Sequence, residues 1–208
     1  MKKIILTAFC LTMVMTMSAE VLNLAIDGLW YVIDTEKQIA VVTAEPKIPG
    51  VSITYTNEPK TIKVVIPETI TYYPSHLENE CYHYPVVGIA SGAFDGNTKI
   101  VEVILPKTVY IIDDGAFYNC SKLRAINLPD GLEYIGQAAF AGCKALKKLI
   151  IPASVEEIGD YAFANCSKLH NVLFKNSLGI NAQRTNWFVG TTARIESILM
   201  PGEKVHIE

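Results

Sequence analysis

The sequence predicts a β-rich repeat solenoid, in which short strands from successive copies of one unit stack around a continuous core. Three observations support this fold class. Four segments ending in Ala-Phe recur 23 residues apart, at Phe94, Phe117, Phe140 and Phe163. Apolar residues keep fixed offsets in every copy, while the residues between them change freely. A unit of this length cannot bury its own apolar stripe, so neighbouring copies must share one interior.

Residues 1–19 read as a secretory signal peptide. Two lysines are followed by an uncharged apolar run and by small residues around Ser18 and Ala19, which predicts cleavage after Ala19. The alternative, a transmembrane anchor, needs a longer apolar run to cross roughly 30 Å of hydrocarbon. No later segment is apolar for long enough either, so we expect an exported chain without a membrane span in its mature part. Its mildly acidic charge and lack of basic runs disfavour nucleic-acid partners.

Residues 20–62 are expected to form an N-terminal β cap. Two β-rich runs within residues 28–44 flank the polar turn at residues 35–38, which indicates a hairpin. A hairpin at this end of the solenoid would shield the unpaired backbone groups of the first repeat strand.

Residues 63–175 are expected to hold the repeats. In each copy, apolar residues two apart, such as Val103 and Leu105, indicate a short strand with one face inward. The proline that follows ends the strand. An isoleucine, a polar or glycine-rich pair and Ala-Phe then predict a turn with a short helical or 3₁₀ segment. The inward columns are Ile100, Leu123, Leu146 and Leu169; Val103, Ile126, Leu149 and Val172; Leu105, Leu128, Ile151 and Phe174; and Ile89, Ile112, Ile135 and Ile158.

An insertion interrupts the period at about residues 69–85. Pro67 precedes Pro106 by 39 residues, which exceeds one period by 16. Tyrosine pairs on either side of a polar, proline-bearing turn predict a β-hairpin. It either caps the solenoid or offers a recognition surface, since tyrosine is favoured in binding sites. The tyrosines are Tyr72, Tyr73, Tyr82 and Tyr84.

Residues 176–208 are expected to form a degenerate repeat and a C-terminal cap. Phe188 follows Phe163 by 25 residues, and the segment 197–201 reads as a last strand. Terminal repeats are normally atypical in this way.

Three cysteines, Cys120, Cys143 and Cys166, occupy one repeat column, three residues after each phenylalanine. Three catalytic nucleophiles at equal repeat spacing would be very unusual, whereas small buried side chains that fill one interior column are expected. We therefore interpret them as packing residues and expect them, with Cys81, to be reduced. His76, Cys81 and His83 cluster loosely in the insertion but do not supply a convincing metal ligand set.

Outward-facing strand residues are the candidate ligand-binding surface. Alternate residues of a strand point away from the core, and three aliphatic side chains in one outward column are unusual for a solvated face. The alternative explanation is plain β-propensity. The candidate residues are Glu102, Ile104, Asn127, Lys148, Ile150, Asn171 and Leu173, with the four hairpin tyrosines beside them.

The repeat pattern, quoted in full by LRAINLPDGLEYIGQAAFAGC at residues 123–143, resembles the BspA-type leucine-rich repeat. The resemblance is strong over residues 86–175 and weak at the flanks. It implies a right-handed leucine-rich-repeat solenoid with a small parallel strand in each repeat, exported by bacteria or displayed on protist surfaces. Some members of the family are adhesins.

The functional hypothesis is an exported, non-enzymatic binding module that recognises an extracellular protein or glycan. A structural component of the cell envelope is the alternative, and a thiol-dependent enzyme comes third. No nucleophile elbow, metalloprotease motif or phosphate-binding glycine loop is present, so no catalytic residue, metal or cofactor is assigned. The partner, any anchoring to the cell and the oligomeric state are left open by the sequence.

Overall fold

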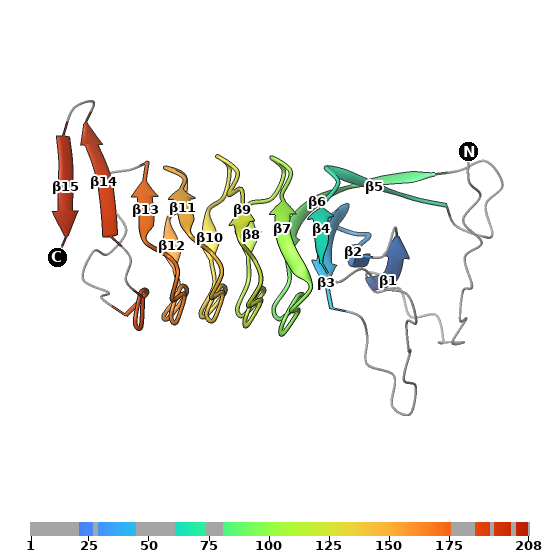
Figure 1. Ribbon diagram of the computed structural model, residues 1–208. Coiled ribbons are helices and arrows are strands. Elements are labelled where there is room, and N and C mark those ends of the chain that lie inside the picture. The colour runs from blue at the N-terminus through green and yellow to red at the C-terminus, as the bar shows by residue number, and fades with distance from the viewer. Residues whose placement is uncertain are drawn as a thin grey trace.

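The structure, a computed structural model, describes residues 21–26, 29–44, 61–73, 81–175, 186–191, 194–200 and 203–207. The predicted signal peptide, the turn of the tyrosine hairpin and most of the segment after Lys175 lie outside these residues. The described part confirms a solenoid in which each repeat lies beside the next (Figure 1).

The short strands of the repeats form two rows, which strands of the chain ends continue. The first row holds β4 (Ile62–Val65), β7 (Ile100–Ile104), β9 (Ala125–Ile126), β11 (Lys148–Ile151), β13 (Asn171–Phe174), β14 (Arg194–Met200) and β15 (Glu203–Ile207). The second row holds β3 (Ile39–Thr43), β6 (Tyr82–Ile89), β8 (Ile111–Ile112), β10 (Tyr134–Ile135) and β12 (Glu157–Ile158). Neighbouring repeat strands pair in parallel at the repeat offset, as Ile112, Ile135 and Ile158 show.

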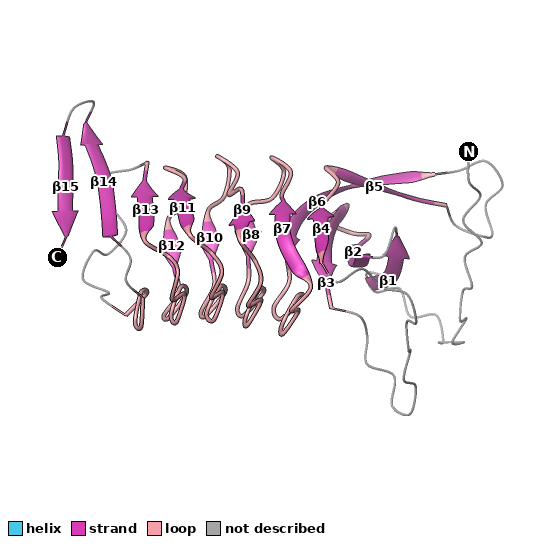
Figure 2. Cartoon of the chain, viewed as in Figure 1, coloured by secondary structure: helices cyan, strands magenta, loops and turns pink. Residues whose placement is uncertain are grey.

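The predicted helical or 3₁₀ segment is wrong: the described residues contain no helix, and turns lead to each phenylalanine (Figure 2). The hydrogen bonds give the reason. The Ala116 N–H donates to Asp113 O of the same turn (3.2 Å), but the next amide, of Phe117, donates to Ala139 O of the following repeat (2.7 Å). Every second amide of the turn donates to a carbonyl of the next repeat. The consecutive hydrogen bonds that a 3₁₀ helix needs within one segment therefore cannot form.

These turns place two columns of residues in the left-handed backbone region. The first column contains Gly92, Gly115, Ala138 and Tyr161, and the second contains Gly96, Asn119, Gly142, Asn165 and Gly190. Glycine adopts this conformation without steric penalty, and asparagine tolerates it better than other residues do. Ala138 and Tyr161 are the two members that fit neither description.

The core is the shared interior that the repeat columns predict. Phe94, Phe117, Phe140, Phe163 and Phe188 stack face to face, with centroids 5.1–5.6 Å apart and ring planes within 13° of parallel. The wider sequence spacing before Phe188 therefore does not break the stack. Offset-stacked rings at this separation add to the free energy that burial alone provides.

The N-terminal cap is a meander of β1 (Val21–Ile26), β2 (Leu29–Asp34) and β3, paired antiparallel. β3 then pairs in parallel with β6, so this meander continues the second row of strands. Tyr31, Ile33, Ala40 and Val42 extend the core into this cap.

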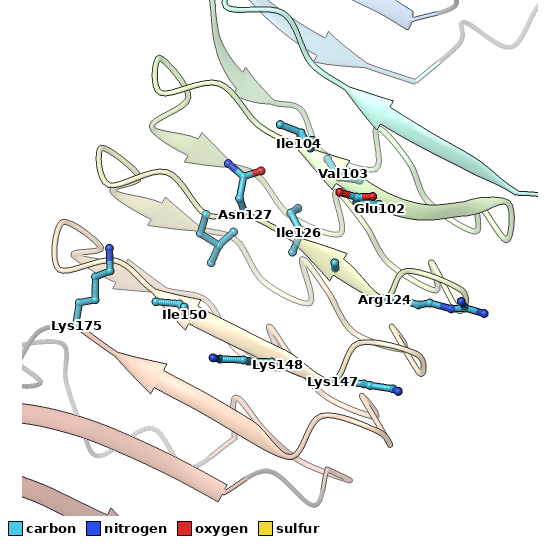
Figure 3. A pocket seen from close by; sticks show the side chains of 12 residues that line it. Glu102, Val103, Ile104, Arg124, Ile126, Asn127, Lys147, Lys148, Ile150 and Lys175 are labelled. Carbon is cyan, nitrogen blue, oxygen red and sulfur yellow. The ribbon is translucent and has the colours of Figure 1, made fainter.

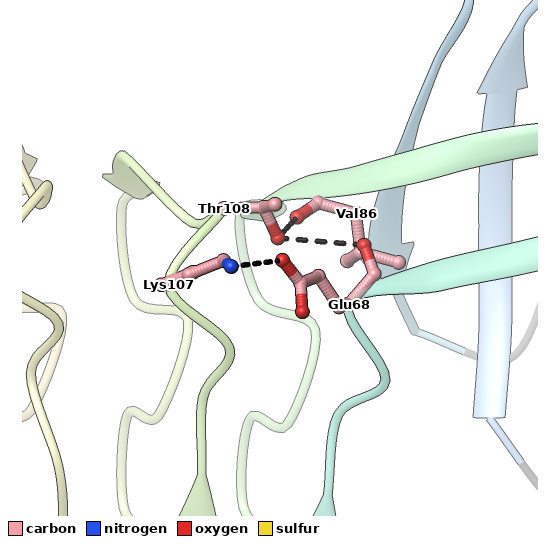
Figure 4. A network of polar contacts seen from close by, with 4 residues as sticks. All are labelled: Glu68, Val86, Lys107 and Thr108. Atoms are coloured by element: carbon pink, nitrogen blue, oxygen red, sulfur yellow. Dashed lines mark hydrogen bonds and ion pairs between the residues drawn. The ribbon is translucent and has the colours of Figure 1, made fainter.

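β5 (Thr69–Tyr72) pairs antiparallel with the first half of β6 and forms the inserted hairpin. Polar contacts fix its base against the first full repeat (Figure 4). Thr108 Oγ1 donates to Val86 O (2.6 Å), and Lys107 Nζ lies 3.1 Å from Glu68 Oε1. β4 pairs in parallel with β7 on the other side of this junction, as expected of an earlier repeat.

Candidate functional site: a groove on the strand face

The predicted outward columns border a groove of about 640 Å³ on the first row of strands (Figure 3). Ile104, Asn127 and Ile150 come from three successive repeats, and Glu102 and Lys148 lie beside them. Ile104 is half-buried, whereas Ile150 is 38% exposed. The repeat register therefore brings five of the candidate residues together.

Asn171 and Leu173 lie next to this groove without lining it. They pair with Lys148 and Ile150, respectively, across the β11–β13 ladder. Both are half-buried on the same face. They extend the surface by one repeat.

The groove lies where the first row of strands is interrupted. β4, β7 and β9 form one sheet and β11, β13, β14 and β15 form another, and no backbone hydrogen bond joins β9 to β11. Asn127 adds a second irregularity, on the side of β9 that faces β7. Its Oδ1 accepts from Leu105 N (2.7 Å) and its Nδ2 donates to Leu105 O (2.9 Å), so a side chain occupies the place of the backbone ladder.

The interruption changes the environment of two residues that the sequence places in the core. Ile126 and Leu128 are only partly buried and line the groove, whereas Leu149 and Ile151 in the next repeat are 1% and 0% exposed. The prediction of a fully buried column is wrong at these two positions. In the sequence, this repeat differs from its neighbours at Asn127, the single polar residue in an otherwise aliphatic outward column.

The unpaired charge at the groove is positive. Glu102 is bound to Lys63 (3.0 Å), and Lys175 is bound to Asp130. Arg124, Lys147 and Lys148 are exposed and form no ion pair with any residue that the structure describes. Arg124 and Lys147 project at one end of the groove and Lys175 at the other (Figure 3).

The tyrosine hairpin does not contribute to this groove. Tyr73 is 67% exposed and Tyr82 36%, and Tyr72 is half-buried. Tyr84 is buried and belongs to the hydrophobic core, so its assignment to an accessible binding surface is wrong. Burial also raises the pKa of the Tyr84 hydroxyl.

Cys81 and His83 lie together on the exposed side of this hairpin. Cys81 Sγ is 3.7 Å from His83 Nε2, and His83 Nδ1 is 3.0 Å from Thr71 Oγ1. No group of three or more potential metal ligands is found in the described part of the chain.

The column cysteines are packing residues. Cys120, Cys143 and Cys166 are fully buried and free, and each thiol donates to the carbonyl of the phenylalanine 26 residues earlier, at 3.0–3.2 Å. Burial raises the pKa of the Cys120 and Cys166 thiols to about 12. A protonated thiol is a poor nucleophile, so this column has no catalytic character.

Stacked parallel strands, repeat-spaced aliphatic columns and a stack of phenylalanines define a leucine-rich-repeat solenoid. Residues 87–208 match the model of the BspA type leucine rich repeat region, in six copies. The chain belongs to the BspA-type leucine-rich repeat family.

Solved structures of leucine-rich repeat proteins are similar to this chain. A leucine-rich repeat protein from Bacteroides ovatus is 30% identical, with a TM-score of 0.52; the match covers 74% of this chain and 42% of that one, so the chain spans less than half the length of this relative. One from Bacteroides capillosus is 28% identical, with a TM-score of 0.55 and coverage of 74% and 98%. The pneumococcal vaccine antigen PcpA, at 19% identity and a TM-score of 0.57 over 87% and 51%, shares the fold.

The comparison with curated proteins gives no match. The family and the solved neighbours are repeat proteins rather than members of an enzyme family. Among the residues that the structure describes, no helix is long and apolar enough to cross a bilayer.

Proposed function

We propose that this protein is an exported, non-enzymatic binding module that recognises a protein or glycan at a cell surface through its strand face. The observation that carries the proposal is the groove between β9 and β11, where Ile126 and Leu128 are left partly open to solvent beside the outward residues Ile104 and Ile150. Apolar surface gathered in one place on a repeat protein is typical of an interaction site. The continuous strand face of a solenoid is suited to an extended contact.

Export is supported by the N-terminal sequence. The lysines, the apolar run and the small residues before Glu20 have the composition and order of a signal peptide. A structure of the same fold from Faecalibacterium prausnitzii is described as a leucine rich cell surface protein; it is 18% identical over 86% of this chain and 51% of that one, with a TM-score of 0.50. N-terminal sequencing of protein recovered outside the cytoplasm is expected to begin at Glu20.

The binding proposal is tested with purified protein on intact host cells and on immobilised extracellular-matrix proteins. Ile150→Glu places a charge at the groove and is expected to reduce binding at least tenfold. Because Ile150 is 38% exposed, the substitution should shift the free energy of unfolding by no more than about 0.5 kcal/mol. Tyr110→Glu, at an exposed position directly before β8 of the second row, is the matched control and should bind normally.

Two results would count against the proposal. If Ile150→Glu bound as well as the unaltered protein, the groove would not be the recognition surface. If neither cells nor matrix proteins retained the unaltered protein, a structural component of the envelope would be the better description.

A further inference from the structure

Charge is segregated between the two sides of the repeats. Within residues 99–175, nine basic side chains and two acidic ones lie on the segments that carry or flank β7, β9, β11 and β13. The segments with β8, β10 and β12 hold the other six acidic side chains and no basic one. The basic residues are Lys99, Lys107, Lys122, Arg124, Lys144, Lys147, Lys148, Lys168 and Lys175. A chain of net charge −3 therefore carries the cations of these repeats on the segments of the first row of strands and most of their carboxylates on the segments of the second.

The groove lies on the first row of strands, and cations without an ion-pair partner border it. Arg124, Lys147 and Lys148 have no carboxylate partner among the described residues. Lys148 borders the groove directly, and Arg124 and Lys147 stand side by side at one end (Figure 3). A concave surface whose unpaired charges are all of one sign attracts ligands of the opposite sign.

The lining between these cations is aliphatic. Val103, Ile104, Ile126, Leu128 and Ile150 contribute to it, and no aromatic side chain does. A groove of aliphatic side chains with a charged edge has the composition of a protein interface, in which apolar contacts fill the centre and polar ones the rim. Sugar rings, by contrast, have no flat aromatic face here on which to stack.

We infer that the groove between β9 and β11 binds a segment of a partner protein that carries both acidic and aliphatic side chains. The inference rests on the proposed binding function and adds the chemistry of the partner. Aspartate or glutamate of the segment pairs with Lys148, Lys147 and Arg124. Its aliphatic side chains cover Ile126 and Leu128, which the interrupted sheet leaves partly open.

The test uses three dye-labelled peptides of equal length and fluorescence anisotropy. The first peptide carries glutamate and leucine, the second lysine in place of glutamate, and the third serine in place of leucine. We expect the first to bind, the second not to bind, and the third to bind at least about fivefold more weakly. Binding of the first should weaken as salt rises, because exposed ion pairs are screened.

The variant Lys147→Glu/Lys148→Glu is expected to reduce affinity for the first peptide at least about fivefold, since each rim pair contributes modestly and reversal adds repulsion. Lys122→Glu/Lys168→Glu makes the same change in net charge at two exposed lysines that do not line the groove. It should bind almost normally. If both double variants lose affinity equally, the groove has no special part and the inference is overturned.

Further results would overturn the inference about the partner. No binding of the first peptide at millimolar concentration, or binding only of a sulfated polysaccharide, would overturn the inference. So would salt-sensitive self-association in sedimentation experiments that Lys147→Glu/Lys148→Glu abolishes, because a second copy would then be the partner. If Ile150→Glu abolishes capture by cells or matrix while Lys147→Glu/Lys148→Glu does not, the proposed function stands and this inference alone fails.

Discussion

The side chain of Asn119 lies directly over Gly142, one repeat further along the solenoid. A β-carbon built at residue 142 would overlap Asn119 Oδ1, and Gly142 itself has φ of +77°. The same relationship joins Asn165 to Gly190. The alternation of glycine and asparagine in this column is therefore a packing rule: each asparagine requires a glycine in the next repeat.

Gly142→Ala is expected to lower the free energy of unfolding by about 2–3 kcal/mol. The left-handed backbone of an alanine contributes about 1 kcal/mol of this loss, and displacement of Asn119 contributes the rest. Denaturant unfolding followed by circular dichroism measures the change. The double variant Asn119→Gly/Gly142→Ala removes the overlap but keeps the backbone strain, so it should recover roughly half of the loss. Full additivity of the two single substitutions would contradict the proposed contact.

The first left-handed column predicts stabilising substitutions. Ala138 has φ of +51° and Tyr161 +59°, at positions where the two earlier repeats have glycine. Ala138→Gly should raise the free energy of unfolding by about 0.5–1 kcal/mol, because relief of the left-handed strain exceeds the entropy that glycine loses on folding. A thermal shift of a few degrees would report it.

The neighbouring Ala139 is the matched control. It is fully buried, and its φ is not positive. Ala139→Gly is therefore expected to destabilise the protein through lost packing and added chain entropy. Equal effects of the two substitutions would show that the strain at Ala138 is negligible.

The phenylalanine stack predicts that loss of a ring costs more unfolding free energy in the middle of the stack than at its end. Phe140 is fully buried between Phe117 and Phe163, at 5.2 and 5.6 Å, whereas Phe188 is only partly buried and stacks on Phe163. Phe140→Ala should destabilise by about 3–5 kcal/mol, and Phe188→Ala by clearly less. Denaturant unfolding of both variants makes the comparison. A larger loss at Phe188 would mean that the last repeat, rather than the centre, limits stability.

The sequence predicts the architecture well because a 23-residue period imposes the same environment on every copy. Burial at Ile112, Ile135 and Ile158 follows from the period alone. The turns were predicted less well, since the competition between helical and inter-repeat hydrogen bonds at Phe117 depends on a neighbour that periodicity does not specify.

The geometry of the candidate site can be predicted from the sequence only in part, for a related reason. Alternation along a strand predicts that Ile104 and Ile150 point outward, and they do. Ile126 and Leu128 are partly exposed where the ladder is interrupted between β9 and β11, which is a departure from the average repeat. Periodicity describes what copies share, so it cannot place a groove that exists because one copy differs.

The thiols predict a difference in chemical reactivity. Burial raises the pKa of Cys120 and Cys166 to about 12, and burial likewise raises that of Cys143, whereas Cys81 is exposed beside His83. A chromogenic disulfide reagent at pH 8 should therefore titrate Cys81 in the folded protein and the three column thiols only after unfolding. Cys81→Ser should abolish the rapid reaction.

The same shifts set a pH dependence of stability. An unfolded thiol loses its proton near pH 8.5, but a column thiol in the folded protein keeps it to about pH 12. The folded state thus binds more protons in this window, so the contribution of these groups to the free energy of unfolding is complete below about pH 8.5 and is lost as the pH rises toward 12. Cys120→Ala/Cys166→Ala should flatten this decline. An unchanged slope between pH 9 and 11 would show that the column thiols do not control alkaline stability, and rapid modification of Cys120 in the folded state would show that the stack opens readily.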